Sequence, residues 1–368
     1  MEDTFRFCDN LGPAKVIHLH ETHSGLKAVL VVDNVARGPA IGGVRMAPDV
    51  STEECFRLAR AMTFKNAAAG LRHGGGKAVI FGDPRVAPED KELLIRAFAG
   101  AIADVQDYIA GPDMGTDETC MAWVHDEVGR SVGLPAALGG IPLDEIGATG
   151  FGLSVAVEVA RDFCDIELKG ARVAVQGFGS VGRHAARFLA EKGAKLVAAA
   201  DSRATVADPA GLDVAALAAL KAQGRSLADH PAGEKLERDA VIGVDCDIWI
   251  PAARPDVLRA NNVDQLKASL VVEGANIPVT AEAEAALHAR GVLVIPDFIA
   301  NAGGVICGAV EYAGGGERQA FETIAEKVRE NTRAVLQASL NNKVIPRAAA
   351  QALARRRVEA AMALRRRA

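Results

Sequence analysis

The chain has 368 residues, of which 49% are hydrophobic and 24% are charged, so it has the length of two domains and the composition of an ordinary globular protein. Aromatic residues make up only 4%, and the formal net charge is −5. These values argue against a nucleic-acid partner, because duplex binding normally requires a basic surface and single-strand binding requires aromatic stacking platforms.

The start of the chain and its cysteines and histidines predict the compartment and the metal content. Residues 1–4 open without the basic and apolar stretches of a signal peptide, so we expect a cytoplasmic protein. The uncharged stretch 298–310 is interrupted by glycine and is too short to span a bilayer, so no membrane association is expected. The six cysteines form no CxxC pair, and His18 and His20 have no evident carboxylate or cysteine partner, so we expect no metal.

The first third of the chain alternates strand-like and helix-like segments. Ser51 and Glu54 form a capping box, which predicts a helix that begins there and ends near residue 70. The segment 73–77 (HGGGK) is interpreted as a glycine loop. The other predicted elements, in chain order, are a strand at 27–32, a short strand at 78–81, a helix that begins at Pro88 and a helix after Thr116.

The rest of the chain has the pattern of a parallel α/β sheet. Residues 131–147 contain two prolines and four glycines and are predicted to be a linker or hinge. The segment 201–245 is expected to be a helical excursion, and 317–368 two helices that break near Ile345-Pro346. The predicted strands are 172–176, 195–200, 248–250, 270–272 and 292–295, and a helix is predicted at 180–192. The arginine runs at 355–357 and 365–367 suit either a solvated helix face or subunit contact, or a polyanion patch.

A glycine motif indicates a dinucleotide. Residues 177–182 (GFGSVG) match GxGxxG between a predicted strand and a predicted helix, where the helix N-terminus offers free N–H groups to a pyrophosphate. Asp201 ends the next strand nineteen residues after Gly182, where a carboxylate can bind both ribose hydroxyls of NAD. Arg203 leaves some tolerance for NADP, and the alternative to the whole interpretation is a glycine-rich turn in an unrelated sheet.

Lys65, Lys77 and Asp113 are candidate catalytic residues. Lys77 follows three glycines, which allow a backbone to approach a ligand closely. Spacing alone favours two ordinary surface lysines and an aspartate in a turn, so the residues by themselves do not establish a catalytic site.

Seven longer motifs are spread over nearly the whole chain. They are GPAIGGVRM (38–46), AMTFKNAAAGLRHGGGKAVIFGDP (61–84), GPDMGT (111–116), ATGFG (148–152), VQGFGSVG (175–182), EGAN (273–276) and PDFIANAGGV (296–305). In these motifs and their order the chain resembles the glutamate/leucine/phenylalanine/valine dehydrogenase family of NAD(P)-dependent L-amino-acid dehydrogenases. Its length and pocket are most similar to leucine/phenylalanine-type members.

The resemblance implies an α/β fold with an N-terminal substrate domain, a Rossmann dinucleotide-binding domain and a catalytic cleft between them. We expect residues 1–135, joined by C-terminal helices at about 340–368, to form the substrate-binding and oligomerisation domain. Residues 136–339 are expected to form the Rossmann domain. The family also implies a homo-oligomer.

The resemblance assigns a role to each candidate residue. Lys77 and Asp113 match the catalytic lysine and the proton-shuttling acid, and Lys65 matches the lysine that binds the substrate α-carboxylate. The other expected substrate-binding residues are Gly42, Gly43, Ile41, Gly111, Val305, Gly308 and Asn301. The expected cofactor-binding residues are Thr149, Gly177, Phe178, Gly179, Ser180, Val181, Gly182, Asp201, Ser202, Ala275, Asn276 and Asn301.

Two departures from the family pattern concern the substrate. Ile41 stands where glutamate-specific members carry a lysine for the side-chain carboxylate, and Gly308 replaces a small polar residue. Burying that carboxylate without a partner costs several kcal/mol. We therefore expect reversible oxidative deamination of an apolar L-amino acid to a 2-oxo acid and ammonium, with NAD as hydride acceptor.

Two alternatives stay open. The approach sequence IPLDEIGATG (141–150) and the long 201–245 segment are more similar to glutamate-type members, which keeps glutamate dehydrogenase as an alternative. A non-catalytic NAD-binding sensor is an alternative of another class, although binding alone does not require Lys65, Lys77 and Asp113 together.

Overall fold

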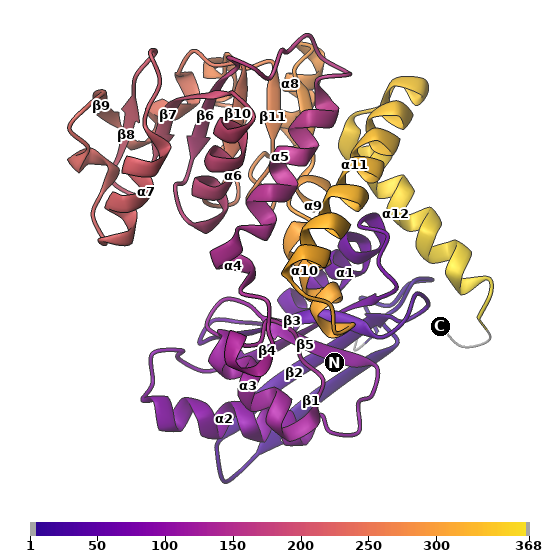
Figure 1. Ribbon diagram of the computed structural model, residues 1–368. Helices are drawn as coiled ribbons and strands as arrows, with labels where there is room; N and C mark the ends of the chain where they lie inside the picture. The colour runs from indigo at the N-terminus through magenta and orange to yellow at the C-terminus, as the bar shows by residue number, and fades with distance from the viewer. Residues whose placement is uncertain (1–4, 366–368) are drawn as a thin grey trace. The chain divides into compact units, whose positions relative to one another are not determined.

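The chain divides into two compact units, each of which is described by itself. A computed structural model describes residues 5–365 (Figure 1). Unit 1 consists of Met1–Pro142, Val305–Ala320 and Gln351–Ala368, and unit 2 consists of Leu143–Gly304 and Phe321–Ala350. Within 5–365, no helix combines the length and the apolar composition that a membrane span requires.

Unit 1 contains a five-stranded sheet of order β1-β2-β4-β3-β5. Its strands are β1 (Lys15–Glu21), β2 (Leu26–Asn34), β3 (Ala40–Ala47), β4 (Gly74–Phe81) and β5 (Tyr108–Pro112). β3 pairs in parallel with β4 and with β5, whereas β2 pairs antiparallel with β1 and β4. β3 therefore separates β4 from β5.

Helices cover both faces of this sheet, because the central strands are apolar on both faces. Val29, Val31 and Val79 pack with the buried face of α1 (Thr52–Ala68). The opposite face, which includes Leu30 and Ile80, packs with α2 (Pro88–Ala101) and α3 (Glu118–Val128).

The predicted capping box at the start of α1 is confirmed in its first half. Ser51 lies at the N-cap, and its Oγ accepts a hydrogen bond from the backbone N–H of Glu54 at 3.1 Å. The carboxylate of Glu54 binds Arg45 instead of returning to the N-cap. The helix thus begins where the sequence indicates, and its third residue is free to serve another contact.

The glycine loop expected at 73–77 is wrong, because Gly74–Gly76 lie within β4. The glycines are required by packing. A Cβ on Gly75 would lie 2.0 Å from the backbone N of Thr63 in α1, and a Cβ on Gly76 would lie 3.0 Å from the Tyr108 ring. Glycine therefore lets α1 and β5 approach this strand closely.

Unit 2 contains a seven-stranded sheet of order β12-β11-β10-β6-β7-β8-β9. The first five strands of that order run parallel, and β8 and β9 continue the sheet antiparallel. The strands are β6 (Arg172–Gln176), β7 (Lys195–Ala200), β8 (Ala204–Ala207), β9 (Glu234–Glu237), β10 (Ile248–Pro251), β11 (Leu270–Val272) and β12 (Leu293–Ile295). The predicted parallel strands are confirmed, and their order is that of a Rossmann-type sheet whose switch point is β6.

The helical excursion expected at 201–245 is only partly correct. The segment contains one α-helix, α7 (Val214–Ala222), but also the strands β8 and β9. Ala, Thr and Val at 204–207 pair with β7 at the sheet edge, and such a four-residue strand has no clear period in the sequence.

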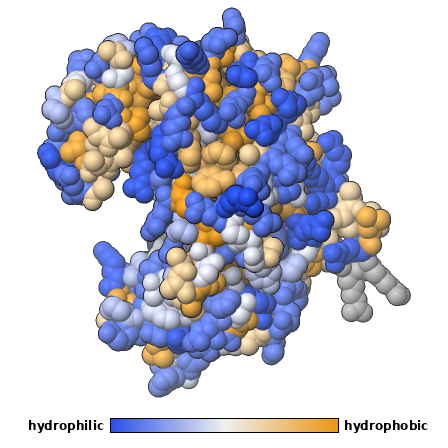
Figure 2. Space-filling view, viewed as in Figure 1, coloured by the Kyte–Doolittle hydropathy of each residue, from blue (hydrophilic) through white to orange (hydrophobic). Residues whose placement is uncertain are grey.

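The break predicted near Ile345-Pro346 is confirmed, because α11 ends at Asn342 and α12 begins at Pro346. The remaining α-helices are α4 (Leu143–Ile146), α5 (Ala148–Ala160), α6 (Ser180–Glu191), α8 (Ala281–Ala289), α9 (Asp297–Ala300), α10 (Gly303–Tyr312), α11 (Glu317–Asn342) and α12 (Pro346–Met362). The arginine run at 365–367 lies mostly outside the described residues. Figure 2 shows mainly hydrophilic residues on the visible surface, with scattered apolar areas.

Candidate active site

Lys77 and Asp113 meet above a glycine of the strand that separates them. Lys77 lies on β4, Asp113 follows β5, and Lys77 Nζ donates a short hydrogen bond to Asp113 Oδ2. A Cβ on Gly43 of β3 would lie 2.9 Å from Asp113 Oδ2 and 3.0 Å from Lys77 Nζ. The pair therefore occupies the space that a side chain at position 43 would fill.

Asp113 is held as a carboxylate by two cations. Its side chain is 19% exposed, and burial acts to raise its pKa, but Lys77 and then Arg45 outweigh burial and hold the pKa below its usual value. Arg45 Nε donates to Asp113 Oδ1 at 2.9 Å, and Arg45 also pairs with Glu54 of α1. Arg45 could not be predicted from spacing, because its partners lie on other elements.

Lys65 lies in the last turn of α1, beside a residue that fixes this end of the helix. The buried Asn66 donates its amide to the carbonyls of Ile41 at 3.2 Å and Gly74 at 2.7 Å. The helix end that carries Lys65 is thereby attached to β3 and β4.

The expected pocket walls gather around a residue that the sequence did not indicate, Val132. Ile41 is 5% exposed and packs in one cluster with Ile109 and Val132. A Cβ on Gly111 or on Gly308 would lie 3.3 Å or 3.5 Å from Cγ2 of Val132. Val305 opens the part of α10 that belongs to unit 1, three residues before Gly308.

Gly42 is required by the backbone of the neighbouring strand. A Cβ at this position would lie 1.7 Å from the carbonyl oxygen of Gly76. The Tyr108 hydroxyl donates to the Gly42 carbonyl at 2.8 Å, which fixes the strand from the other side. Both glycines of the GG pair thus serve close approach, Gly42 to backbone and Gly43 to the Lys77–Asp113 pair.

The GxGxxG segment fits a dinucleotide pyrophosphate. Gly177 has φ +94°, and a Cβ on Gly182 would lie 1.9 Å from the carbonyl oxygen of Gly177, so both positions need glycine for the turn itself. A Cβ on Gly179 would meet nothing within 4 Å, which leaves open space in front of the N-terminus of α6. Phe178 is 1% exposed and packs in the interior, and the Ser180 hydroxyl donates to Asp144.

The carboxylate of Asp201 is bound by several donors of the segment that follows β7. Its side chain is 6% exposed, and it accepts hydrogen bonds from Lys221 Nζ at 3.1 Å and from the backbone N–H of Leu227 at 2.9 Å. Burial acts to raise its pKa, but the hydrogen bonds from Leu227 and Arg203 N–H and from Lys221 lower the pKa to about 2. Ser202, the next residue, is exposed.

The EGAN and NAGG segments lie together in unit 2. Asn301 is buried, and its Nδ2 donates to the Gly274 carbonyl at 3.2 Å and to Asn276 Oδ1 at 3.1 Å, with a longer contact to the Ala275 carbonyl at 3.5 Å. A Cβ on Gly274 would lie 3.2 Å from Cγ1 of Val181, so residues 273–277 pack against the start of α6.

Thr149 belongs to the same group, since a Cβ on Gly304 would lie 3.1 Å from its Oγ1. The structure thus brings together the predicted cofactor residues 149, 181, 275, 276 and 301 within unit 2.

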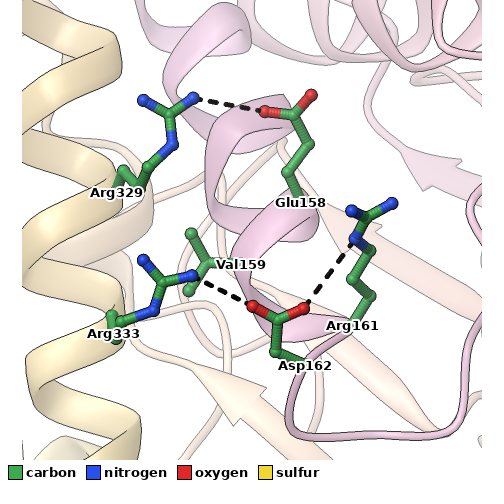
Figure 3. Close-up of a pocket in the computed structure, with 6 residues that line it drawn as sticks. All are labelled: Glu158, Val159, Arg161, Asp162, Arg329 and Arg333. Atoms are coloured by element: carbon green, nitrogen blue, oxygen red, sulfur yellow. Dashed lines mark hydrogen bonds and ion pairs between the residues drawn. The ribbon is translucent and has the colours of Figure 1, made fainter.

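A surface pocket elsewhere in unit 2 is lined by paired charges (Figure 3). Arg333 and Arg329 of α11 face Asp162 at 3.0 Å and Glu158 at 3.8 Å. These side chains are between one third and about half exposed, and surface ion pairs of this kind contribute about 0–1 kcal/mol each. The pocket is an ion-paired contact between α5 and α11, and we assign it no chemistry.

The Rossmann-type sheet with its open GxGxxG segment, and the buried lysine–aspartate pair, define a dinucleotide-dependent oxidoreductase. The chain belongs to the Glu/Leu/Phe/Val dehydrogenase family of NAD(P)-dependent amino-acid dehydrogenases. The family's dimerisation-domain model matches residues 13–130, and the Glutamate/Leucine/Phenylalanine/Valine dehydrogenase model matches residues 139–366.

Individual relatives agree with this assignment. The chain is 40% identical over 323 residues to a glutamate dehydrogenase of Aeropyrum pernix, covering 82% of this chain and 77% of the relative. It is 39% identical over 297 residues to an NADP-specific glutamate dehydrogenase of Saccharolobus shibatae, covering 76% and 69%. Among solved structures, a hetero-hexameric glutamate dehydrogenase from Thermus thermophilus in a Leu-bound form superposes with a TM-score of 0.84 at 32% identity, covering 96% of this chain and 90% of that chain.

The prediction of an apolar substrate is wrong, because curated relatives at about 40% identity are glutamate dehydrogenases. The structure gives a physical reason for the error. Ile41 and Gly308 both lie against Val132, so their apolar character is explained by packing within unit 1. A carboxylate can also be bound by backbone N–H groups and other donors, so one missing lysine does not define the substrate.

Proposed function

We propose that this chain is a glutamate dehydrogenase, which converts L-glutamate and an oxidised nicotinamide dinucleotide reversibly into 2-oxoglutarate, ammonium and the reduced dinucleotide. The observation that carries the proposal is the buried Lys77–Asp113 pair above Gly43, in a chain about 40% identical to glutamate dehydrogenases. The alternative of a sensor without turnover has no need of such a pair.

We assign three side chains of unit 1 different roles in binding and converting the substrate. We assign Lys65 to the α-carboxylate, for which a cation is the natural partner. Asp113 is ionised at neutral pH because its pKa is lowered, so it can accept a proton from the α-amine. Asp113 passes that proton to solvent, and Lys77, 4% exposed and bound to Asp113, orients the water that adds to the iminium carbon. Asp113 accepts the proton of this water and returns it to the amine, which leaves as ammonium, together with the remaining hydroxyl proton, when the carbonyl forms.

Residues of unit 2 hold the cofactor in this proposal. The backbone N–H groups that begin α6 bind the pyrophosphate across the open space at Gly179, and Thr149, Asn276 and Asn301 bind the nicotinamide end. When bound, the nicotinamide ring supplies the acceptor for the hydride that leaves Cα.

We propose NAD as the preferred dinucleotide. Asp201 keeps its negative charge at the end of β7, with a pKa of about 2, and a 2′-phosphate would meet that charge unfavourably. Because Lys221 lies 3.1 Å from the same carboxylate and offsets part of the charge, we expect a modest preference.

We further propose that unit 1, which includes residues 1–135 together with 305–320, serves substrate binding and self-association, and that unit 2 serves cofactor binding. The match of residues 13–130 to a dimerisation-domain model supports self-association. Light scattering of the purified chain tests it, and a monomeric mass at assay concentrations would contradict it.

Steady-state formation of reduced dinucleotide tests the activity. We expect L-glutamate to support turnover with NAD, and Lys77→Ala to abolish turnover while the chain still binds NADH. Turnover with L-leucine or L-phenylalanine but not with L-glutamate would refute glutamate as the substrate. No turnover with any amino acid, in a chain that binds NADH normally, would favour the non-catalytic NAD-binding sensor.

Ile41→Lys gives an independent test of the substrate side chain. If position 41 faces the γ-carboxylate, the added cation lowers the KM for glutamate about tenfold, whereas the uncharged Ile41→Met control of similar volume leaves it near the wild-type value. Equal effects of both variants would contradict the placement of position 41.

A further inference from the structure

A buried cluster of four ionisable residues in unit 2 takes no part in the chemistry described above. Arg347, near the start of α12, donates hydrogen bonds to Glu273 at 2.6 Å, Glu284 at 2.7 Å and Asp297 at 2.8 Å. The three carboxylate side chains are 0%, 2% and 7% exposed, and Arg347 itself is 17% exposed. Such a cluster is costly to bury, and it is weak evidence for a role in stability alone.

Two of the three carboxylates hold the ends of one loop. Glu273 begins the segment 273–277, and its Oε2 also accepts the backbone N–H of Asp297 at 2.8 Å. At the other end, Asp297 Oδ2 accepts the backbone N–H of Ile277 at 2.9 Å. Arg347 binds both acids, so a single guanidinium joins the two ends of the loop.

The loop needs this support because its last residue is strained. Ile277 has φ +49°, a left-handed conformation that is unfavourable for a β-branched residue. Its side chain is 55% exposed, so packing of that side chain does not compensate for the strain. The backbone of Ile277 is instead held by two hydrogen bonds, from its N–H to Asp297 and from the Asp256 N–H to its carbonyl at 2.9 Å.

The middle of the loop carries Ala275, which the family resemblance predicts to bind the cofactor, and Asn276, to which the proposed function assigns a cofactor contact. Asn301, which follows α9, donates to the Gly274 carbonyl and to Asn276 Oδ1, and Asp297 begins the same short helix. Arg347 thus fixes the loop directly through Glu273 and indirectly through the helix that places Asn301.

We propose that Arg347 is a positioning residue for the dinucleotide: by joining Glu273 to Asp297 it holds the loop 273–277 in the conformation that binds the cofactor. This inference rests on the proposed function, because it requires the loop to contact the dinucleotide. Glu284, the third partner, contacts Arg347 from α8 and makes no recorded hydrogen bond to the loop among residues 5–365, so it provides a matched control.

The experiment compares NADH binding, measured by fluorescence titration, in wild type, Arg347→Lys and Glu284→Gln. A lysine keeps the charge, but its three N–H donors share one nitrogen and cannot reproduce the planar fork with which the guanidinium spans the three acids, so we expect the Kd for NADH to rise about tenfold. Glu284→Gln also removes one ionic contact of Arg347 but leaves both loop ends joined, so its Kd stays within about twofold of wild type.

A second variant distinguishes a displaced loop from a misfolded chain. Asp297→Asn keeps an oxygen that accepts the Ile277 N–H but weakens the link to Arg347, and we expect its Kd to rise in the same direction while its circular dichroism stays that of the wild type. In the Arg347→Lys background, Ile277→Gly relieves the unfavourable φ and is expected to recover part of the lost affinity. A purely structural role of Arg347 would not produce that recovery.

The outcomes separate the two proposals. An unchanged Kd in Arg347→Lys and Asp297→Asn, or an equal rise in Glu284→Gln, overturns the positioning role while the wild type still binds NADH. A wild type that binds neither NADH nor NADPH overturns the proposed function and this inference with it.

Discussion

Replacement of Glu273 by glutamine should make unit 2 more resistant to unfolding at alkaline pH. Burial raises the pKa of Glu273 to about 8 from its ordinary value of 4.5; Arg347 opposes the rise, and Asp297 and Glu284 add to it. Between these two pH values the folded chain keeps a proton that the unfolded chain releases. Stability therefore falls as pH rises from about 4.5 and levels off above about 8.

The size of the effect follows from the pKa difference. Between about pH 5.5 and about pH 8 the penalty grows by about 1.4 kcal/mol for each pH unit, which gives at most about 3 kcal/mol. Glutamine places an oxygen toward Arg347 and its NH2 group at the position of Oε1, which accepts no hydrogen bond within residues 5–365. That unpaired donor costs about 1–3 kcal/mol at both pH values and cancels from the comparison.

Urea unfolding at the two pH values measures the difference. In a Trp123→Phe background, Trp249 is the one remaining tryptophan and lies fully buried on β10 of unit 2, so its fluorescence reports the unfolding of that unit. We expect the stability of Glu273→Gln relative to the parent to increase by about 2–3 kcal/mol from the lower to the higher pH. Glu330→Gln, at an exposed position of α11, controls for the loss of one negative charge. The same difference at both pH values would refute a proton held by Glu273.

Three further perturbations test the site. Asp113→Asn removes the proton acceptor, so kcat for glutamate should fall at least about 10²-fold while NADH binding is unchanged; near-normal kcat would contradict its role. Gly42→Ala places a methyl group 1.7 Å from the Gly76 carbonyl oxygen and should lower the free energy of unfolding by about 1–3 kcal/mol, whereas Gly100→Ala, in open space within α2, should raise it by about 0.5–1 kcal/mol. Asp201→Asn should reduce the ratio of kcat/KM for NAD over NADP, and an unchanged ratio would remove Asp201 from cofactor choice.

The parallel sheet of unit 2 could be predicted from the sequence because its strands are short apolar runs bounded by glycine or polar residues. β6, β7 and β11 begin and end at the residues expected. β3 could not be predicted, because its two glycines suggest a turn. In the structure these glycines are required because the backbone and side chains of other strands approach them closely. Local periodicity contains no information about such an approach.

Of the candidate site, too, some residues could be predicted from the sequence and others could not. Lys77 and Asp113 could be proposed from motifs, and the structure brings them into contact, whereas their assigned roles stay predictions. Arg347 could not be found, since its three partners lie 50, 63 and 74 residues away in the chain. Val132 could not be predicted for a similar reason, because nothing near it in the sequence shows that it packs between Gly111 and Gly308.

The absence of a side chain at Gly43 has a consequence for any redesign of this enzyme. β4 and β5 lie two strand spacings apart, about 9–10 Å, and their lysine and aspartate touch only because nothing rises from the strand between them. Even the methyl group of an alanine at position 43 would come too close to Lys77 Nζ and Asp113 Oδ2 and would push them apart. Efforts to change substrate choice near this strand should therefore leave position 43 untouched and work from residue 41 or 308, which pack against Val132 and not against the lysine or the aspartate.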